Sequence, residues 1–334
     1  FQQFYNMADT LIVGRLVGVD ALAAVGSTAI VIYLVLCFIQ GITGGFGICL
    51  GHRFGARDEK GMRRSVAVSI ILCIFFTVII TAICCGLAHQ ILYWQRTPEK
   101  ICDMAYDYMF AVLLGTGATI FYNMISNILR ALGDSRTPLI FLIFSSLLNI
   151  FLDVVFIVPL QMGVAGAAWA TVLSQLLSAV LCTVIGVRKF LILRLKKEDF
   201  TLLSSALKIH LCIGFPMGFQ MSVMCIGQLA MQGAVNALGT EAIAGYTAAT
   251  KVDQISVLMN AAFGIAISNY VAQNYGAGLW DRIRKGTAAC LLQTSIANAI
   301  MCVMIIFGRH LVVPMFVSQP TAEIIWYSDH YLLT

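Results

Sequence analysis

Residues 138–160 read PLIFLIFSSLLNIFLDVVFIVPL, an apolar run in which Asp153 is the one charged residue. A helix needs about 20 residues to cross the roughly 30 Å of hydrocarbon in a bilayer. This stretch is long enough to do so, and it therefore predicts a membrane-spanning helix.

Similar apolar runs recur along the chain, separated by short polar segments. We expect eight complete membrane helices and a truncated helix at each end, in a chain that has lost the start of its first helix and its last helices. The predicted ranges are 1–13, 21–50, 65–92, 101–131, 138–160, 164–187, 207–237, 241–275, 286–307 and 322–334. Several exceed the length of a straight crossing, which indicates tilt or bending, and Pro216 permits a kink. The expected fold class is all-α, a polytopic transmembrane helix bundle.

The composition of the whole chain agrees with this prediction. Of 334 residues, 60% are hydrophobic and 11% are charged, and the mean hydropathy is +0.88. Soluble domains carry about 25% charged residues, so a water-soluble globular enzyme is excluded. The eleven cysteines form no CxxC or Cys/His metal pattern. We expect the cysteines to be small core residues that pack between the helices. We expect neither a cofactor nor a metal beyond a coupling ion.

The basic residues predict the orientation of the helices. Sixteen of the 21 lysines and arginines lie in loops on one side of the predicted membrane, and four lie on the other. The positive-inside rule places the first set in the cytoplasm. That set is Arg53, Arg57, Lys60, Arg63, Arg64, Arg130, Arg136, Arg188, Lys189, Arg194, Lys196, Lys197, Lys208, Arg282, Arg284 and Lys285. Topology explains the net charge of +5, so we expect a multi-pass plasma-membrane protein that binds no nucleic acid.

An internal repeat predicts the architecture. A shift of 221 residues aligns residues 52–56 with 273–277 and Gly18 with Gly239. Six spans separate the copies, so both enter the membrane in the same direction, as in a parallel repeat. We expect two parallel six-helix lobes: residues 1–190 as the first, 191–205 as a cytoplasmic linker, and 206–334 as the first three helices and the start of a fourth in a truncated second lobe.

Four strings of residues resemble a known family. They are Tyr5-Asn6-Met7-Ala8-Asp9-Thr10, the loop Arg130-Ala131-Leu132-Gly133-Asp134-Ser135-Arg136-Thr137-Pro138, the helix with Asn149 and Asp153, and Gly163-Val164-Ala165-Gly166-Ala167-Ala168-Trp169-Ala170-Thr171. In this order they are similar to the multidrug and toxic compound extrusion (MATE) family. The resemblance implies twelve helices in two lobes, a V-shaped central cavity, and cation-driven efflux of amphipathic organic compounds.

Two carboxylates lie deep in the predicted first lobe, Asp9 and Asp153. A charge at bilayer depth costs on the order of 2.5–3.5 kcal/mol, so each of these carboxylates should have a partner or a function. Asn149 and Asp153 are four residues apart and share a helix face, and the small residues 166–170 permit close approach of a neighbouring helix. The resemblance implies a cation or proton site made by Asp9, Asn149, Asp153 and Thr171. The alternative is that each side chain only bonds a neighbouring helix.

The residues leave the coupling ion open. Two nearby carboxylates in a low-dielectric lobe cannot both ionise cheaply, so one would hold an exchangeable proton. A Na⁺ ion at Asp9, Asn149 and Asp153 would instead use their oxygen atoms as ligands. The coupling ion is therefore H⁺ or Na⁺.

Further residues are candidates for lining the substrate cavity, although helix packing is the alternative for all of them. They are Gln2 and Tyr5 on the helix of Asp9, Tyr122 and Asn123 on the fourth helix, and the stripe Met217, Met221 and Met224 on the seventh. Methionine adapts to varied ligands. Some members of the resembled family carry an acidic residue at the position of Met224.

We therefore expect a cation-coupled antiporter that exports amphipathic, mostly cationic organic compounds or drugs by alternating access. The alternative is a flippase for lipid-linked saccharides, which would need several basic residues within the central helices, where Lys251 stands alone. The five histidines form no catalytic pattern, so we expect no enzyme. The expected partners are small organic substrates and the lipid bilayer, and the expected state is a monomer.

Overall fold

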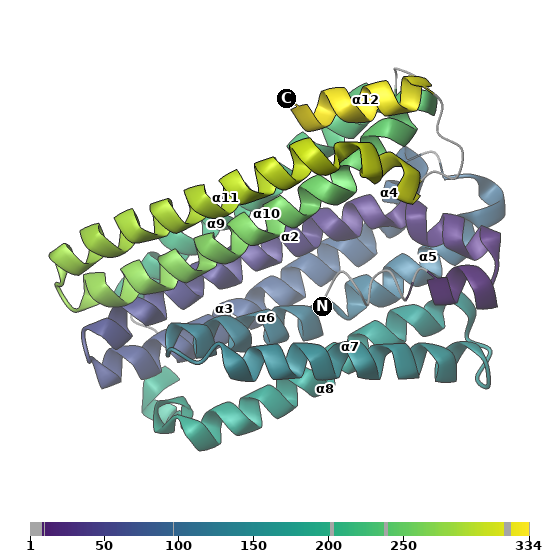
Figure 1. The fold of residues 1–334 in the computed structure, drawn as a ribbon. Helices are drawn as coiled ribbons and strands as arrows, with labels where there is room; N and C mark the ends of the chain where they lie inside the picture. Colours follow the sequence, from purple (N-terminus) through teal and green to yellow (C-terminus); the bar gives the residue numbers. More distant parts are fainter. Residues whose placement is uncertain are drawn as a thin grey trace. The chain divides into compact units, whose positions relative to one another are not determined.

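The computed structural model describes residue 9 and residues 11–95, 97–200, 204–236, 240–316 and 322–333. This part of the chain is helical and contains no strand (Figure 1). Eight of its helical stretches are long and apolar enough to cross a membrane. The all-α membrane bundle expected from the sequence is thereby confirmed.

The helices follow one another with short connections. Asp9 and residues 11–16 are helical and precede α2. The labelled helices are α2 (Val19–Gly55), α3 (Glu59–Gly86), α4 (Ala88–Trp94), α5 (Glu99–Leu114), α6 (Thr116–Ala131), α7 (Arg136–Ile157), α8 (Gly163–Lys189), α9 (Ser204–Asn236), α10 (Thr240–Gly276), α11 (Trp280–Phe316) and α12 (Ala322–Leu333). With 37 residues, α2 is about 55 Å long and exceeds the hydrocarbon thickness, as predicted.

Two predicted spans are each divided in the structure. The run 65–92 breaks at Leu87 between α3 and α4, and the run 101–131 breaks at Gly115 between α5 and α6. Gly115 also lies close to α8, because a side chain there would collide with Val172. Hydropathy alone did not predict these breaks, because apolar residues continue through both of them.

The chain divides into two compact units, Phe1–Cys225 and Ile226–Thr334. In the first unit, a large apolar core joins α2, α3, α6 and α8, including the fully buried Phe46, Ile128 and Leu129. In the second unit, α10, α11 and α12 pack on one another, and the amides of Asn260 and Asn298 exchange two hydrogen bonds. The predicted lobes and the linker at 191–205 stay a prediction.

Within the first unit, the first part of α9 crosses α2 through glycines. A Cβ atom on Gly41 would lie 2.6 Å from the Cα atom of Gly218, and one on Gly45 would lie 2.6 Å from that of Gly214. Each helix thus presents two glycines four residues apart, the arrangement that lets membrane helices approach closely. Phe38 of α2 packs edge-on against rings of α9 beside this crossing.

Candidate functional site

The structure brings together the four residues Asp9, Asn149, Asp153 and Thr171. With its amide nitrogen facing Asp9, Asn149 donates to Asp9 Oδ1 at 2.8 Å, and its amide oxygen lies 3.2 Å from Thr171 Oγ1. The Thr171 hydroxyl also lies 3.4 Å from Asp9 Oδ2. Three helical segments therefore meet at this carboxylate cluster: the segment of Asp9, α7 and α8.

Asp153 is the most enclosed member of the carboxylate cluster, with a side chain that is 0% exposed. Its carboxyl group lies close enough to the Asp9 carboxyl for the two groups to interact. Neither oxygen of Asp153 receives a hydrogen bond from a donor in the described part of the chain. Two ionised carboxylates in contact would repel each other strongly in a low dielectric. The arrangement is suited to a proton between the two groups or to a bound cation.

Small residues on α8 make this meeting possible. A Cβ atom on Gly166 would lie 3.1 Å from the Cβ atom of Phe156, so α8 runs close to α7. Ala168 and Ala170 are fully buried on the same stretch. The close approach predicted for residues 166–170 lets the short side chain of Thr171 reach Asn149.

An apolar layer covers one side of the carboxylate cluster. It consists of Val13, Ala21, Ile157, Val164 and Ala167, each less than 8% exposed. Each helix that carries a charged or hydroxyl group of the cluster also contributes to this layer, four residues away. The pairs are Asp9 with Val13, Asp153 with Ile157, and Thr171 with Ala167. The layer therefore lies one helical turn from the polar groups, on the side opposite the basic loops.

The two candidates on α6 bond to other groups. The Tyr122 hydroxyl donates to the carbonyl oxygen of Pro138 at 3.1 Å, which ties α6 to α7. Asn123 Nδ2 donates to the Thr119 carbonyl oxygen of its own helix at 2.9 Å. Both side chains are half-buried, and their role in a substrate cavity stays a prediction.

The methionine stripe lies on α9. Met221 and Met224 are 39% and 55% exposed, whereas Met217 is half-buried and faces Gly44 of α2. Gln2 and Tyr5 lie outside the described residues. The proposed contact of all these residues with substrate stays a prediction.

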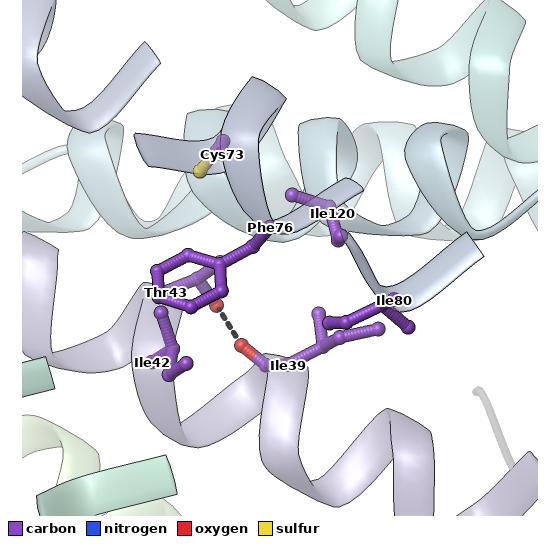
Figure 2. Close-up of a pocket in the computed structure, with 7 residues that line it drawn as sticks. All are labelled: Ile39, Ile42, Thr43, Cys73, Phe76, Ile80 and Ile120. Carbon is purple, nitrogen blue, oxygen red and sulfur yellow. Dashed lines mark hydrogen bonds between the residues drawn. The ribbon is translucent and has the colours of Figure 1, made fainter. Parts of the chain in front are cut away.

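A separate apolar pocket lies between α2, α3 and α6 (Figure 2). It is lined by Ile39, Ile42, Thr43, Cys73, Phe76, Ile80 and Ile120. Its hydroxyl group, on Thr43, donates to the carbonyl oxygen of Ile39 at 2.8 Å and accepts from Asn127 Nδ2 at 3.3 Å. None of the lining residues is charged, so we regard the pocket as a packing feature of the core.

The polar side chains beyond Thr171 were not predicted from the sequence. Thr119 Oγ1 of α6 donates to Gln175 Oε1 of α8 at 2.6 Å. A signal was present, because Gln175 follows Thr171 by one turn and Thr119 precedes Asn123 by one turn. Which helix faces which could not be inferred from that spacing.

Comparison with known proteins identifies the family. The MatE family profile matches residues 1–155 and 216–334. The chain belongs to the MatE family. It is 31% identical to "Probable multidrug resistance protein YpnP" of Bacillus subtilis (strain 168), over 99% of this chain and 74% of that protein. It is 27% identical to "Probable multidrug resistance protein YoeA" of the same organism, over 95% and 70%.

A solved structure agrees with the fold. The outward-facing conformation of a multidrug resistance MATE family transporter superposes with a TM-score of 0.90 at 24% identity, covering 100% of this chain and 74% of that one. The chain belongs to a multidrug efflux transporter family, whose members are transporters rather than enzymes and need no cofactor. The protein is a multi-pass plasma-membrane protein. The lipid-linked saccharide flippase is not favoured.

Proposed function

We propose that this protein is a proton-coupled antiporter that exports amphipathic organic cations by alternating access, with Asp9 and Asp153 as its coupling pair. The observation that carries the proposal is the closeness of the Asp9 and Asp153 carboxyl groups. Asp153 is fully enclosed, and its oxygens have no donor among the described residues. A shared proton supplies the missing donor and removes one of the two charges.

Proton binding changes the free energy of the closed carboxylate cluster. With one proton, the pair carries a single charge and can stay packed beneath the apolar layer. Without it, two negative charges in a low dielectric repel each other and favour a state in which water or a cation enters. A protonated and a deprotonated cluster therefore favour different arrangements of the lobe, which is the requirement for coupling.

Asn149 and Thr171 position this pair. The Asn149 amide donates to Asp9, and the Thr171 hydroxyl lies within reach of both Asn149 and Asp9. These bonds hold the Asp9 carboxyl toward Asp153. Neither residue titrates, so we assign them a supporting role in coupling.

The substrate class rests on the family and on the names of two relatives, which are called probable multidrug resistance proteins. In a transporter that exchanges a proton for an organic cation, the same negative charge binds the proton in one state and attracts the cation in the other. We therefore propose amphipathic cations as cargo, and we propose that the basic loops face the cytoplasm and that the protein works as a monomer.

Transport by the purified protein in proteoliposomes tests this function. We expect a pH gradient to drive uptake or release of a fluorescent organic cation, and an equal Na⁺ gradient at constant pH to drive none. Transport by the Na⁺ gradient alone would replace the proton with Na⁺, for which the carboxylate, amide and hydroxyl oxygens of the carboxylate cluster are suitable ligands. Transport with neither gradient would refute coupling.

A further inference from the structure

Polar side chains follow one another away from the carboxylate cluster, on the side opposite the apolar layer. Gln175 follows Thr171 by one turn on α8 and accepts from the Thr119 hydroxyl of α6 at 2.6 Å. Asn123, one turn further along α6, donates to the Thr119 carbonyl oxygen at 2.9 Å. The chain of contacts therefore passes from α8 to α6 and then descends along α6.

Polar side chains continue to the end of α6 that carries basic residues. Asn127 lies one turn beyond Asn123 and donates to Thr43 Oγ1 at 3.3 Å. Its own Oδ1 accepts from Arg130 Nη1 at 3.0 Å. The half-buried Arg130 thus closes the lower end of the series.

The two helices run in parallel and in constant register along this path. A Cβ atom on Gly115 would meet Val172, and one on Gly186 would lie 3.2 Å from the Leu129 side chain. The same offset in residue number at both ends means that α6 and α8 face each other over their whole shared length. We call the polar groups along them the polar seam. Its members are Thr171, Gln175 and Ser178 of α8 and Thr119, Asn123, Ser126, Asn127 and Arg130 of α6.

Two buried hydroxyl groups on α6 and α8 give the polar seam a second, independent feature. Ser126 is 1% exposed and Ser178 is 0% exposed, and neither hydroxyl has a hydrogen-bond partner in the part of the chain that the structure describes. Serine in a helix ordinarily bonds a carbonyl one turn back, as Ser69 does on α3. Buried polar groups without protein partners are typical places for ordered water.

We infer that the polar seam is the path along which the coupling proton moves between the Asp9 and Asp153 pair and the face with the basic loops. The apolar layer closes the opposite side in this state. Water molecules at Ser126 and Ser178 bridge the gaps between the side chains. Arg130 closes the path at the face with the basic loops. Its positive charge and its bond to Asn127 oppose cation entry until that bond breaks. The inference rests on the proposed function.

The first test removes the hydrogen bond between Thr119 and Gln175, which joins α6 to α8 in the polar seam. Thr119→Val keeps the shape but removes the hydroxyl that bonds Gln175. The matched control is Thr77→Val on α3, where the hydroxyl bonds only the Cys73 carbonyl of its own helix. In proteoliposomes with an entrapped pH dye, we expect Thr119→Val to slow substrate-triggered proton movement about ten-fold. We expect the control to match the unmodified protein, and both variants to retain equilibrium binding of the organic cation.

The second test changes no protein–protein hydrogen bond. Ser126→Ala combined with Ser178→Ala removes two hydroxyls that have no protein partner among the described residues, so folding should be unaffected. Ser69→Ala is the control. We expect proton movement to slow in the double variant, with an unchanged unfolding midpoint. Proton movement at the unmodified rate in both Thr119→Val and the double serine variant would overturn the polar seam as a path. If Asp9→Asn meanwhile abolishes driven transport, only this inference fails; if Asp9→Asn transports normally, the proposed function fails.

Discussion

The Lys189 ammonium group lies 2.7 Å from Asp134 Oδ2, in an ion pair that ties the end of α8 to the loop before α7. The Asp134 side chain is 5% exposed and also accepts the backbone N–H groups of Arg136 and Thr137 at 3.1 Å. The Thr137 hydroxyl donates to it at 2.6 Å. One carboxylate therefore caps α7 and anchors α8, the two helices that carry Asn149, Asp153 and Thr171.

Replacing this carboxylate should destabilise the first unit. Asp134→Ala removes a helix cap and leaves Lys189 without its ion-pair partner, so we expect a loss of about 1–2 kcal/mol in the free energy of unfolding. Chemical unfolding in detergent, followed by tryptophan fluorescence, measures this loss. The control is Asp20→Asn, because Asp20 and Lys100 form an exposed ion pair that should contribute little. Equal losses in both variants would contradict the assigned role.

The same carboxylate predicts a dependence of stability on pH. Burial opposes ionisation of Asp134, but the bonds from Lys189 and Thr137 outweigh it and lower its pKa from 3.8 to about 2. A group with a lowered pKa in the folded state stabilises the protein above its unfolded pKa. Its contribution should be complete above about pH 4 and vanish as the pH falls toward 2. The difference in unfolding midpoint between the unmodified protein and Asp134→Asn should follow this curve; a difference that persists unchanged at pH 2 would exclude it.

Hydropathy predicted the membrane spans because each crossing needs an apolar run, and helical spacing placed Asn149 and Asp153 on one face. The breaks at Leu87 and Gly115 could not be predicted from hydropathy, since apolar residues continue through both of them. The partners of Asp134 were equally hidden, because Lys189 lies 55 residues away in sequence.

The glycine crossing between α2 and α9 shows the same limit. Gly214 and Gly218 have the spacing of a close helix contact, but the spacing does not reveal which helix lies opposite them. Only the three-dimensional arrangement pairs them with Gly45 and Gly41.

A methyl group at this crossing should be costly. In Gly41→Ala the new Cβ atom would collide with the backbone of α9 at Met217 and Gly218, and we expect a loss of about 1–3 kcal/mol in stability. Gly26→Ala on the same helix is the control, because nothing lies within 4 Å of its added Cβ atom. Thermal unfolding in detergent compares the two. Equal midpoints would show that α2 and α9 do not approach each other this closely.

The proposed orientation can be tested by cysteine labelling. Lys60→Cys and Lys196→Cys place thiols at exposed positions on the side with the basic loops, and Lys100→Cys places one on the other side. We expect a membrane-impermeant maleimide to label Lys100→Cys in intact cells and to label the other two only after permeabilisation. The unmodified protein gives the background from its own cysteines. Labelling of Lys60→Cys or Lys196→Cys in intact cells would reverse the orientation.

Asn149 should matter less to coupling than the two carboxylates. Asn149→Ala removes the amide that donates to Asp9 but no titrating group, so the Asp9 and Asp153 pair can still exchange a proton. We expect driven transport to be slowed but retained, and its pH profile to shift because Asp9 loses a donor. Complete loss of driven transport with an unchanged protein fold would show that Asn149 itself is indispensable to ion binding.

The central claim is that Asp9 and Asp153 couple a proton to substrate movement, and transport driven by a pH gradient in Asp9→Asn and Asp153→Asn proteoliposomes tests it most directly. We expect both variants to insert and bind substrate, because a lost charge lowers the insertion cost, and to accumulate no substrate against its gradient. Asp20→Asn should accumulate it as the unmodified protein does. Normal driven accumulation by both deep variants would contradict the account.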